Sequence, residues 1–333
     1  MDSMSTQIAI VGGGPAGLAT AQILQSAGHS LITFDKGPIA AHIARLPPYM
    51  TFFSTADLLE IGGFPLIISR EKPTRQEYLN YLRRFVREFK LDVRTGHEVI
   101  ALNGEKGTFG LRGRNRCGEE FEVHAERVVL ATGAFDTPRM LDIPGEDLSK
   151  VSHYYSEVHS YFGMKVLIIG GKNSAVEAAL ELWRSGIDVS ICHRRPEFGT
   201  LKYWLAPDIE NRVANGEIKA YRPAEAVEIR PHSVLLRMHS GETLEVANDY
   251  VLALTGYRPD PKLLARFGIS VDSETDRPSF NSTTLESERP GVYIVGVMLA
   301  GNVSGEIFIE NSRTHGEKIL AHLNNGSSPS TAS

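Results

Sequence analysis

The sequence predicts an α/β fold in which two domains share one plan and the second is inserted in the first. Two observations predict this. The order strand, glycine-rich turn, helix, strand occurs at residues 7–35 and again at 165–195, and a later strand in each copy ends in Thr-Gly. A further strand, 289–296, and a helical segment, 306–323, follow the second copy. They must complete the first domain, because the second is already closed.

Residues 7–35 contain the first glycine turn. Gly12, Gly14 and Gly17 stand between an apolar strand and a helix, and Asp35 ends the next strand. Glycines at this spacing let the backbone turn tightly and approach a pyrophosphate, whose charge meets the helix N-terminus. An acid at the end of the second strand suits a free ribose hydroxyl. The segment is therefore predicted to be a dinucleotide-binding unit of the Rossmann type.

Residues 165–195 repeat this order with a changed fingerprint. Gly170, Lys172 and Ala175 occupy the positions of the three glycines. Lys172 stands where the backbone would approach a pyrophosphate, so its ammonium is a candidate partner for phosphate. The alternative is a lysine that points into solvent.

The end of the second strand in this copy is basic. His193 takes the place of Asp35, and Arg194 and Arg195 follow directly. Two guanidinium groups suit a 2′-phosphate by charge and by bidentate geometry, which predicts NADPH rather than NADH here. The alternative is a solvated basic turn.

Alternating apolar and polar segments precede each Thr-Gly strand and predict antiparallel strands, as in a three-layer ββα domain. The first copy is longer, and the excess falls in residues 38–69, a long irregular insertion that we expect to form part of the binding site. We expect one domain from residues 1–150 and 276–325, an inserted domain from 151–275, and a disordered tail from 326–333.

Composition excludes several classes of function. The net charge of −5 gives no reason to expect nucleic acid or an anionic membrane as a partner. No apolar run reaches the roughly 18 residues of a spanning helix, and no signal pattern precedes the first strand. We therefore expect a cytoplasmic protein. Cys117 and Cys192 form no CxxC pair, so neither a structural metal site nor a redox dithiol is expected.

These motifs resemble the two-dinucleotide-binding flavoproteins of the thioredoxin reductase type over nearly the whole chain. A closer similarity is to the bacillithiol disulfide reductase family, in "TFFSTADLLEIGGFP", "HYYSEVHSYF", "GGKNSAVEAALEL", "DYVLALTGYRPD" and "IFIEN". The resemblance implies a cytoplasmic, dimeric oxidoreductase that binds FAD in the first unit and NADPH in the second. It would pass hydride from NADPH to FAD and on to a small-molecule disulfide or a small redox protein. Lys172 is a feature of this branch.

The motifs and the resemblance together assign the cofactor-binding residues. The candidates for FAD are Gly12, Gly14, Pro15, Ala16, Gly17, Asp35, Lys36, Phe52, Ser54, Thr132, Gly133, Gly296 and Ile307. The candidates for NADPH are Gly170, Lys172, Asn173, Ser174, Ala175, His193, Arg194, Arg195 and Gly256. A helix from about Ile307 is expected to point its amides toward the flavin pyrimidine edge. Phe52 and Phe53 either flank the flavin or pack in the core.

The sequence departs from the resembled families at two positions. Gly296 is followed by Val297 rather than the acid of thioredoxin reductases, and Ala16 replaces the motif cysteine proposed to form a mixed disulfide in bacillithiol disulfide reductases. No catalytic residue is therefore assigned, and the missing dithiol excludes thioredoxin reduction by the usual route. Two alternatives remain: a ferredoxin or flavodoxin NADP reductase, which needs no cysteine, and a non-catalytic redox sensor.

Overall fold

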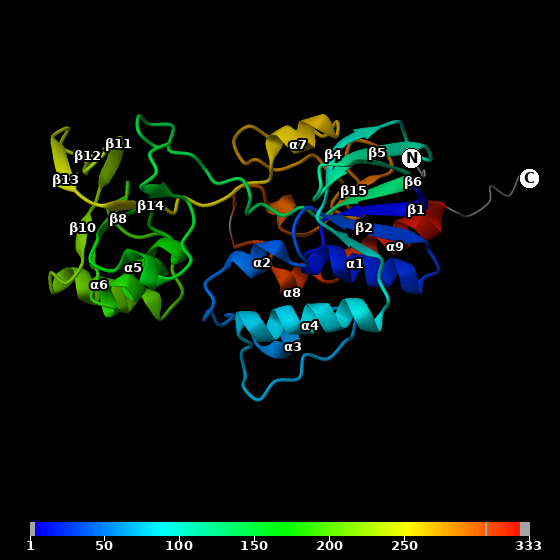
Figure 1. Cartoon of the computed structure of the whole chain (residues 1–333), viewed down its shortest axis with the longest axis horizontal. Helices are drawn as coiled ribbons and strands as arrows, with labels where there is room; N and C mark the ends of the chain where they lie inside the picture. The colour runs from blue at the N-terminus through cyan, green and yellow to red at the C-terminus, as the bar shows by residue number, and fades with distance from the viewer. Residues whose placement is uncertain (1–3, 304, 327–333) are drawn as a thin grey trace, which may run out of the picture. The chain divides into compact units, whose positions relative to one another are not determined.

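The computed structural model describes residues 4–303 and 305–326, which divide into two compact units (Figure 1). Unit 1 combines the chain up to Thr137 with the chain from Tyr257 onward, and unit 2 is Pro138–Gly256. The second unit is therefore inserted in the first, as predicted.

Unit 1 is built on a parallel sheet. Its strands are β1 (Met4–Val11), β2 (Leu31–Asp35), β3 (Val93–Thr95), β6 (Glu120–Leu130) and β15 (Val292–Ile294), paired in the order β3-β2-β1-β6-β15. β4 (His97–Asn103) and β5 (Phe109–Asn115) add antiparallel pairs to the first half of β6. The second half of β1 and most of β2 are buried apolar runs because the sheet is covered on both faces.

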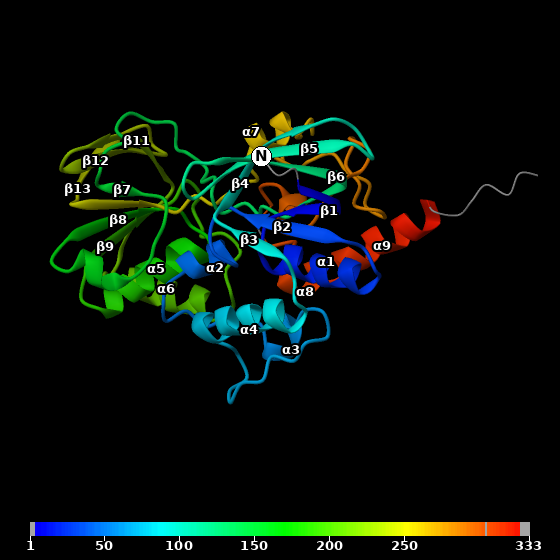
Figure 2. The same cartoon turned by 45° about the vertical axis from the view of Figure 1, so that its right-hand side comes forward.

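Helices cover one side of this sheet. α1 (Pro15–Ser26) packs against α9 (His315–Gly326), and Figure 2 shows both with α4 (Arg75–Glu88) on one side of the strands and β5 on the other. The short helices α2 (Ala41–Arg45) and α3 (Ala56–Leu59) lie within the insertion. α7 (Pro261–Arg266), α8 (Ile309–Ser312) and a 3₁₀ turn, η2 (Gly296–Ala300), complete the unit.

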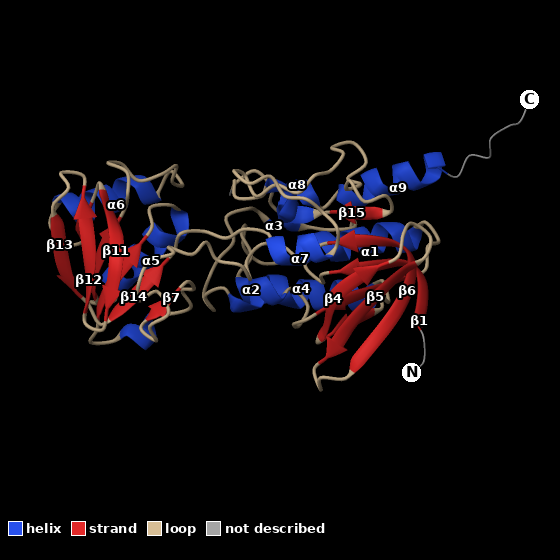
Figure 3. Cartoon of the chain, turned by 90° about the horizontal axis from the view of Figure 1, so that it is seen from above, coloured by secondary structure: helices blue, strands red, loops and turns tan. Residues whose placement is uncertain are grey.

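Unit 2 repeats the plan. Its parallel strands are β7 (Val151–Ser152), β8 (Lys165–Ile169), β9 (Asp188–Cys192), β10 (Lys219–Tyr221) and β14 (Tyr250–Ala253), in the order β10-β9-β8-β14-β7. One face packs on α5 (Asn173–Arg184), α6 (Leu205–Ala214) and the 3₁₀ turn η1 (Val158–Tyr161). The other packs on an antiparallel sheet of β11 (Ala224–Arg230), β12 (Ser233–Met238) and β13 (Thr243–Ala247), visible among the red strands of Figure 3.

The shared strand order confirms the predicted pair of three-layer domains, with one difference between the copies. In unit 1 the antiparallel and parallel stretches form one continuous strand, β6. In unit 2 the corresponding strands, β13 and β14, are separate. The break falls at Asn248, whose side chain is buried and accepts a hydrogen bond from the ammonium of Lys150 at 2.6 Å. The side-chain amide nitrogen of Asn248 also donates to the carbonyl of Val246 at 2.9 Å, and such local side-chain bonding competes with continuation of the strand.

The unit boundaries lie earlier in the chain than the predicted 150/151 and 275/276. After residue 256, Leu264, Phe267 and Ile269 are buried in the core of unit 1. Before residue 151, Leu141 and Leu148 pack against the core of unit 2. These contacts join segments that are far apart in the sequence, so the local sequence pattern does not predict where each unit begins and ends. Of the predicted tail, all but Gly326 lies outside the described residues.

The single helix predicted from about Ile307 is wrong, because the chain forms two helices that break at Arg313 and Thr314. α8 has four residues and begins at Ile309. Arg313 then donates to the carbonyls of Asp57 and Glu60 in the insertion, and the chain restarts as α9. Such a short helix contributes little dipole toward a flavin. Along the described part of the chain, every helix is too short or too polar to cross a membrane.

Candidate dinucleotide-binding sites

The first glycine turn joins β1 to α1, and its glycines have different structural roles. A Cβ on Gly12 (φ +121°) would overlap the backbone carbonyl of Ala131, and a Cβ on Gly17 would overlap the carbonyl oxygen of Gly12. A Cβ on Gly14 would meet no atom within 4 Å. Gly12 and Gly17 are therefore required by the protein's own packing, whereas Gly14 borders open space, as expected where a ligand approaches the backbone.

The helices that follow both turns have uncapped N-termini. The N-cap of α1 is Gly14 and that of α5 is Lys172, and neither helix has a side-chain capping bond. In contrast, α4 has a capping box and Asp260 caps α7. First-turn amides without a side-chain acceptor favour an anion such as a pyrophosphate. Pro15 and Asn173 stand at the first helical positions, with the exposed Ser174 next in α5.

Asp35 closes the first turn. Its two carboxylate oxygens accept hydrogen bonds from the amides of Gly13 at 2.7 Å and Gly37 at 2.8 Å. Burial raises the pKa of this carboxyl above its ordinary value, against the opposing effect of the two amides. The carboxylate thus fixes the turn, and its further lone pairs can accept a hydroxyl. Lys36 pairs instead with Asp136 at 2.9 Å, which sequence reasoning missed.

The second turn explains how a lysine replaces a glycine. A Cβ on Gly170 would lie 2.5 Å from the carbonyl oxygen of Leu254, so this glycine is needed for packing. Ala175 is buried at the position of Gly17. Lys172 has φ −107° and ψ −174°, which any residue adopts, and its side chain is exposed. The backbone therefore sets no requirement for glycine at residue 172.

Basic side chains surround the end of β9. The His193 ring lies against Gly171, and its buried Nε2 has no hydrogen-bond partner among the described residues. Burial lowers the pKa of His193, and the positive charges of Arg194, Arg195 and Arg222 lower it further. Both Arg194 and Arg195 are exposed, and neither forms an ion pair with any residue of the described ranges. Their charges are thus available to a ligand.

The remaining glycine candidates follow the carboxyl ends of parallel strands, at the same sheet edge as the glycine turn of their unit. Gly133 (φ +72°) follows β6, Gly296 (φ +76°) follows β15, and Gly256 (φ +98°) follows β14 in unit 2. The Thr132 hydroxyl donates to the sulfur of Met298 at 3.3 Å. Each unit therefore gathers its candidates at one edge.

The side chain of residue 16 faces Gly296. A Cβ added to Gly296 would lie 3.0 Å from the Cβ of Ala16. The amide of Gly296 donates to Nδ1 of the buried His315 at 3.1 Å. Burial lowers the pKa of His315 to about 4, so its imidazole is neutral at pH 7. Sequence reasoning missed His315, since only the fold brings α9 to this turn.

The insertion contains three candidate flavin contacts, Phe52, Phe53 and Ser54, which lie in different surroundings. The Phe52 ring lies edge-on to Tyr78 at 4.9 Å and packs on the core, which favours the packing alternative for Phe52. Phe53 is 52% exposed. The Ser54 hydroxyl donates to the carboxylate of Glu310. Whether any of these side chains contacts flavin stays a prediction.

Neither thiol lies at residue 16, although Cys192 ends β9 beside the second turn, where its carbonyl accepts a hydrogen bond from the amide of Gly170. Burial raises the pKa of Cys192 to about 12, so it is protonated, and Cys117 is exposed in the turn between β5 and β6. Within the described residues, no cluster of His, Cys, Asp and Glu could hold a metal ion.

Comparisons with known proteins agree with this geometry. Residues 9–296 match the family described as "Pyridine nucleotide-disulphide oxidoreductase". The chain is 39% identical to Bacilliredoxin reductase Bdr from Bacillus subtilis, over 94% of this chain and 96% of that protein. It superposes on the structure of bacillithiol disulfide reductase Bdr (YpdA) from Bacillus cereus with a TM-score of 0.94 at 38% identity, covering 97% and 100% of the two chains. A ferredoxin–NADP reductase from Thermus thermophilus is 27% identical, over 87% and 84%. The fold and the resemblance predicted from sequence are confirmed.

Proposed function

Because the chain belongs to the pyridine nucleotide-disulphide oxidoreductase family, we propose that it reduces a low-molecular-weight disulfide of the bacillithiol type with NADPH. It is a flavoprotein oxidoreductase of the kind that uses FAD and NADPH. The observation that carries the proposal is the likeness to bacillithiol disulfide reductase along almost the whole chain. The family match includes both glycine turns and the basic strand end.

The residues of unit 1 fit FAD. Gly14 borders open space, the N-terminus of α1 is uncapped, and Asp35 holds the turn through two backbone amides. These groups would hold the pyrophosphate and the ribose. When bound, FAD supplies two-electron redox chemistry at its ring. Gly296, held by His315 and facing Ala16, would shape the backbone beside that ring.

The residues of unit 2 fit NADPH. The uncapped N-terminus of α5 suits the pyrophosphate, and Arg194 and Arg195 suit the 2′-phosphate. Lys172 stands at the N-cap of α5, where its ammonium can add a point charge for phosphate. Unit 2 would therefore prefer NADPH over NADH because the positive charges of Arg194 and Arg195, at the end of β9, attract the 2′-phosphate.

The chain supplies no thiol of its own at residue 16. Alanine cannot attack a disulfide, while a thiolate can. We therefore expect this protein to turn over bacillithiol disulfide slowly or not at all. This is also the observation that favours a second candidate, a ferredoxin–NADP reductase, which needs no cysteine and to which the chain is similar at lower identity.

A panel of acceptors tests the proposal. NADPH consumption by purified protein is followed with bacillithiol disulfide, with a bacilliredoxin mixed disulfide, with ferredoxin and with no acceptor. Consumption that depends on either disulfide supports the proposal. Fast ferredoxin reduction with inert disulfides supports the second candidate, and NADPH binding without turnover supports a sensor.

We also propose a cytoplasmic homo-oligomer, in the first place a dimer. The apolar side chains of Ile67 and Phe162 are largely exposed, and contact with a second copy would remove them from water. Light scattering on the purified protein distinguishes a dimer from a monomer.

A further inference from the structure

The loop that joins β9 to α6 carries the basic residues of unit 2. Arg194 and Arg195 stand at its start, and Phe198 follows with its ring half-buried. The Phe198 ring stacks on the imidazole of His193, with 6.2 Å between the ring centres and 25° between the planes. The position of Phe198 is thus linked to the strand end that would meet a 2′-phosphate.

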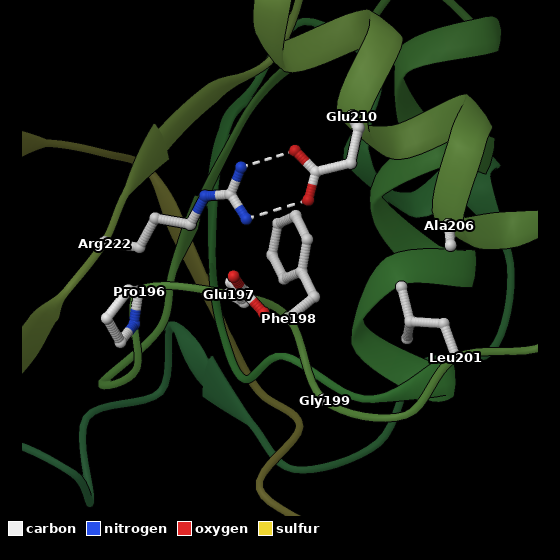
Figure 4. Close-up of a pocket in the computed structure, with 8 residues that line it drawn as sticks. All are labelled: Pro196, Glu197, Phe198, Gly199, Leu201, Ala206, Glu210 and Arg222. Atoms are coloured by element: carbon white, nitrogen blue, oxygen red, sulfur yellow. Dashed lines mark hydrogen bonds and ion pairs between the residues drawn. The ribbon is translucent and has the colours of Figure 1, made fainter.

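Arg222, directly after β10, holds this ring from another element. Its guanidinium carbon lies 4.4 Å from the centre of the Phe198 ring. Its two terminal nitrogens donate to the two carboxylate oxygens of Glu210 on α6, at 2.9 and 2.5 Å (Figure 4). Only 17% of the Arg222 side chain is exposed. A planar guanidinium can make a bidentate pair and a ring contact together, whereas an ammonium cannot.

A cavity of about 390 Å³ lies between the loop and α6, so apolar packing holds the loop only in part, through Phe198 and Leu201 against the core that includes Leu205 and Ile209. Figure 4 shows the residues that line it: Pro196, Glu197, Phe198, Gly199, Leu201, Ala206, Glu210 and Arg222. On its other side the loop is tied to the glycine turn. The Gly199 amide donates to the carbonyl of Gly171 at 2.8 Å, and the Lys202 amide donates to the side chain of Asn173 at 2.9 Å.

From these contacts we infer that Arg222, fixed by Glu210, positions the loop that presents Arg194 and Arg195, and so contributes to selection of a 2′-phosphorylated nucleotide. The inference rests on the proposed use of NADPH by unit 2. Arg222 is a positioning residue, because Glu210 already neutralises its charge and Phe198 covers one face. Because the cavity interrupts the apolar packing on the α6 side, the contact of Arg222 with Phe198 adds to what holds the loop there.

Binding of nucleotide fragments to the FAD-loaded protein tests the inference without turnover. 2′,5′-ADP and 5′-AMP differ by one 2′-phosphate, so calorimetry with both measures preference for that group. Arg222→Gln is expected to lower the preference about tenfold, the scale of one charge-assisted hydrogen bond, while the affinity for 5′-AMP is retained. Arg222→Lys should recover only part of the loss. Arg230→Gln is the matched control, because Arg230 pairs with Glu228 and Glu245 on the antiparallel sheet of the same unit.

A second variant separates positioning from direct contact and serves if Arg222→Gln does not fold. Glu210→Ala releases Arg222 and should also lower the preference. Tighter binding of 2′,5′-ADP to this variant would make Arg222 a phosphate ligand and overturn the inference. Wild-type preference in both variants would also overturn it. If the wild-type protein itself does not favour 2′,5′-ADP, the proposed use of NADPH fails instead.

Discussion

The two glycine turns share one backbone plan and end in opposite charges. In unit 1 the second strand ends at Asp35, whose carboxylate is tied to two amides of the turn. In unit 2 it is followed by His193, Arg194 and Arg195, and the two arginines are exposed without ion-pair partners in the described chain. Packing and ligand choice are therefore encoded at different positions of the same motif.

The turns also differ at the N-cap of the following helix. Gly14 and Lys172 both have ordinary negative φ angles, and neither position is needed for close packing. Gly12 and Gly170 have positive φ and lie against a neighbouring strand end. The residue type can therefore differ at the N-cap position, whereas the first position of the turn requires glycine.

The largest expected effect separates these two kinds of glycine. Gly12→Ala should lower the free energy of unfolding by about 2–6 kcal/mol, because positive φ and backbone overlap each cost roughly 1–3 kcal/mol. Gly14→Ala should stay within about 1 kcal/mol of wild type but lose FAD affinity, since its methyl group enters open space. Urea unfolding of the FAD-free variants and flavin titration measure both. Equal stability of the two variants would contradict the described packing.

The next effect tests the basic strand end. The double variant Arg194→Ala, Arg195→Ala should lose most of the preference for NADPH over NADH. Each lost charge-assisted contact should weaken NADPH binding by about 1.5–3 kcal/mol. The ratio of kcat/KM for the two nucleotides measures this. A ratio unchanged from the parent would mean that the arginines form only a solvated turn.

A smaller effect concerns residue 16. Ala16→Cys adds one sulfur beside Gly296 and should leave flavin binding intact while raising turnover of bacillithiol disulfide by about tenfold or more. Ala27→Cys is the matched control, because it adds an exposed thiol at the other end of α1. Rapid disulfide turnover by the unmodified chain would show that no thiol is required here. Equal gains in both variants would show that the position of the thiol does not matter.

The smallest effect is a pH dependence from Asp35. Burial raises its pKa in the folded state above the ordinary 3.8, so its stabilising contribution is full below that value and is lost as pH rises through the folded pKa. Asp35→Asn does not titrate. The unfolding free energy of FAD-free wild type relative to this variant should therefore fall with rising pH and then level off. A relative rise would mean that the amides of Gly13 and Gly37 outweigh burial.

Local signals predicted much of the fold and both turns. Glycine spacing, apolar runs and strand-terminal charges are properties of short segments, and β2 and β9 end where the sequence indicates. Contacts across the chain could not be predicted in the same way. Burial of Phe267 in unit 1, the bond from Gly296 to His315 and the contact of Arg222 with Phe198 each join distant segments. The break before α9 likewise depends on Arg313 reaching the insertion.

Two roles follow for the two units. Unit 1, with Asp35 at its strand end, holds FAD, and unit 2, with Arg194 and Arg195 at its strand end, selects NADPH. Anaerobic mixing of the FAD-loaded protein with NADPH or NADH, followed by loss of flavin colour, tests this assignment most directly. We expect a yellow protein that is reduced at least about tenfold more efficiently by NADPH than by NADH, as expected from one or more charge-assisted contacts. Equal or faster reduction by NADH, or a purified protein that fails to bind FAD, would contradict this assignment.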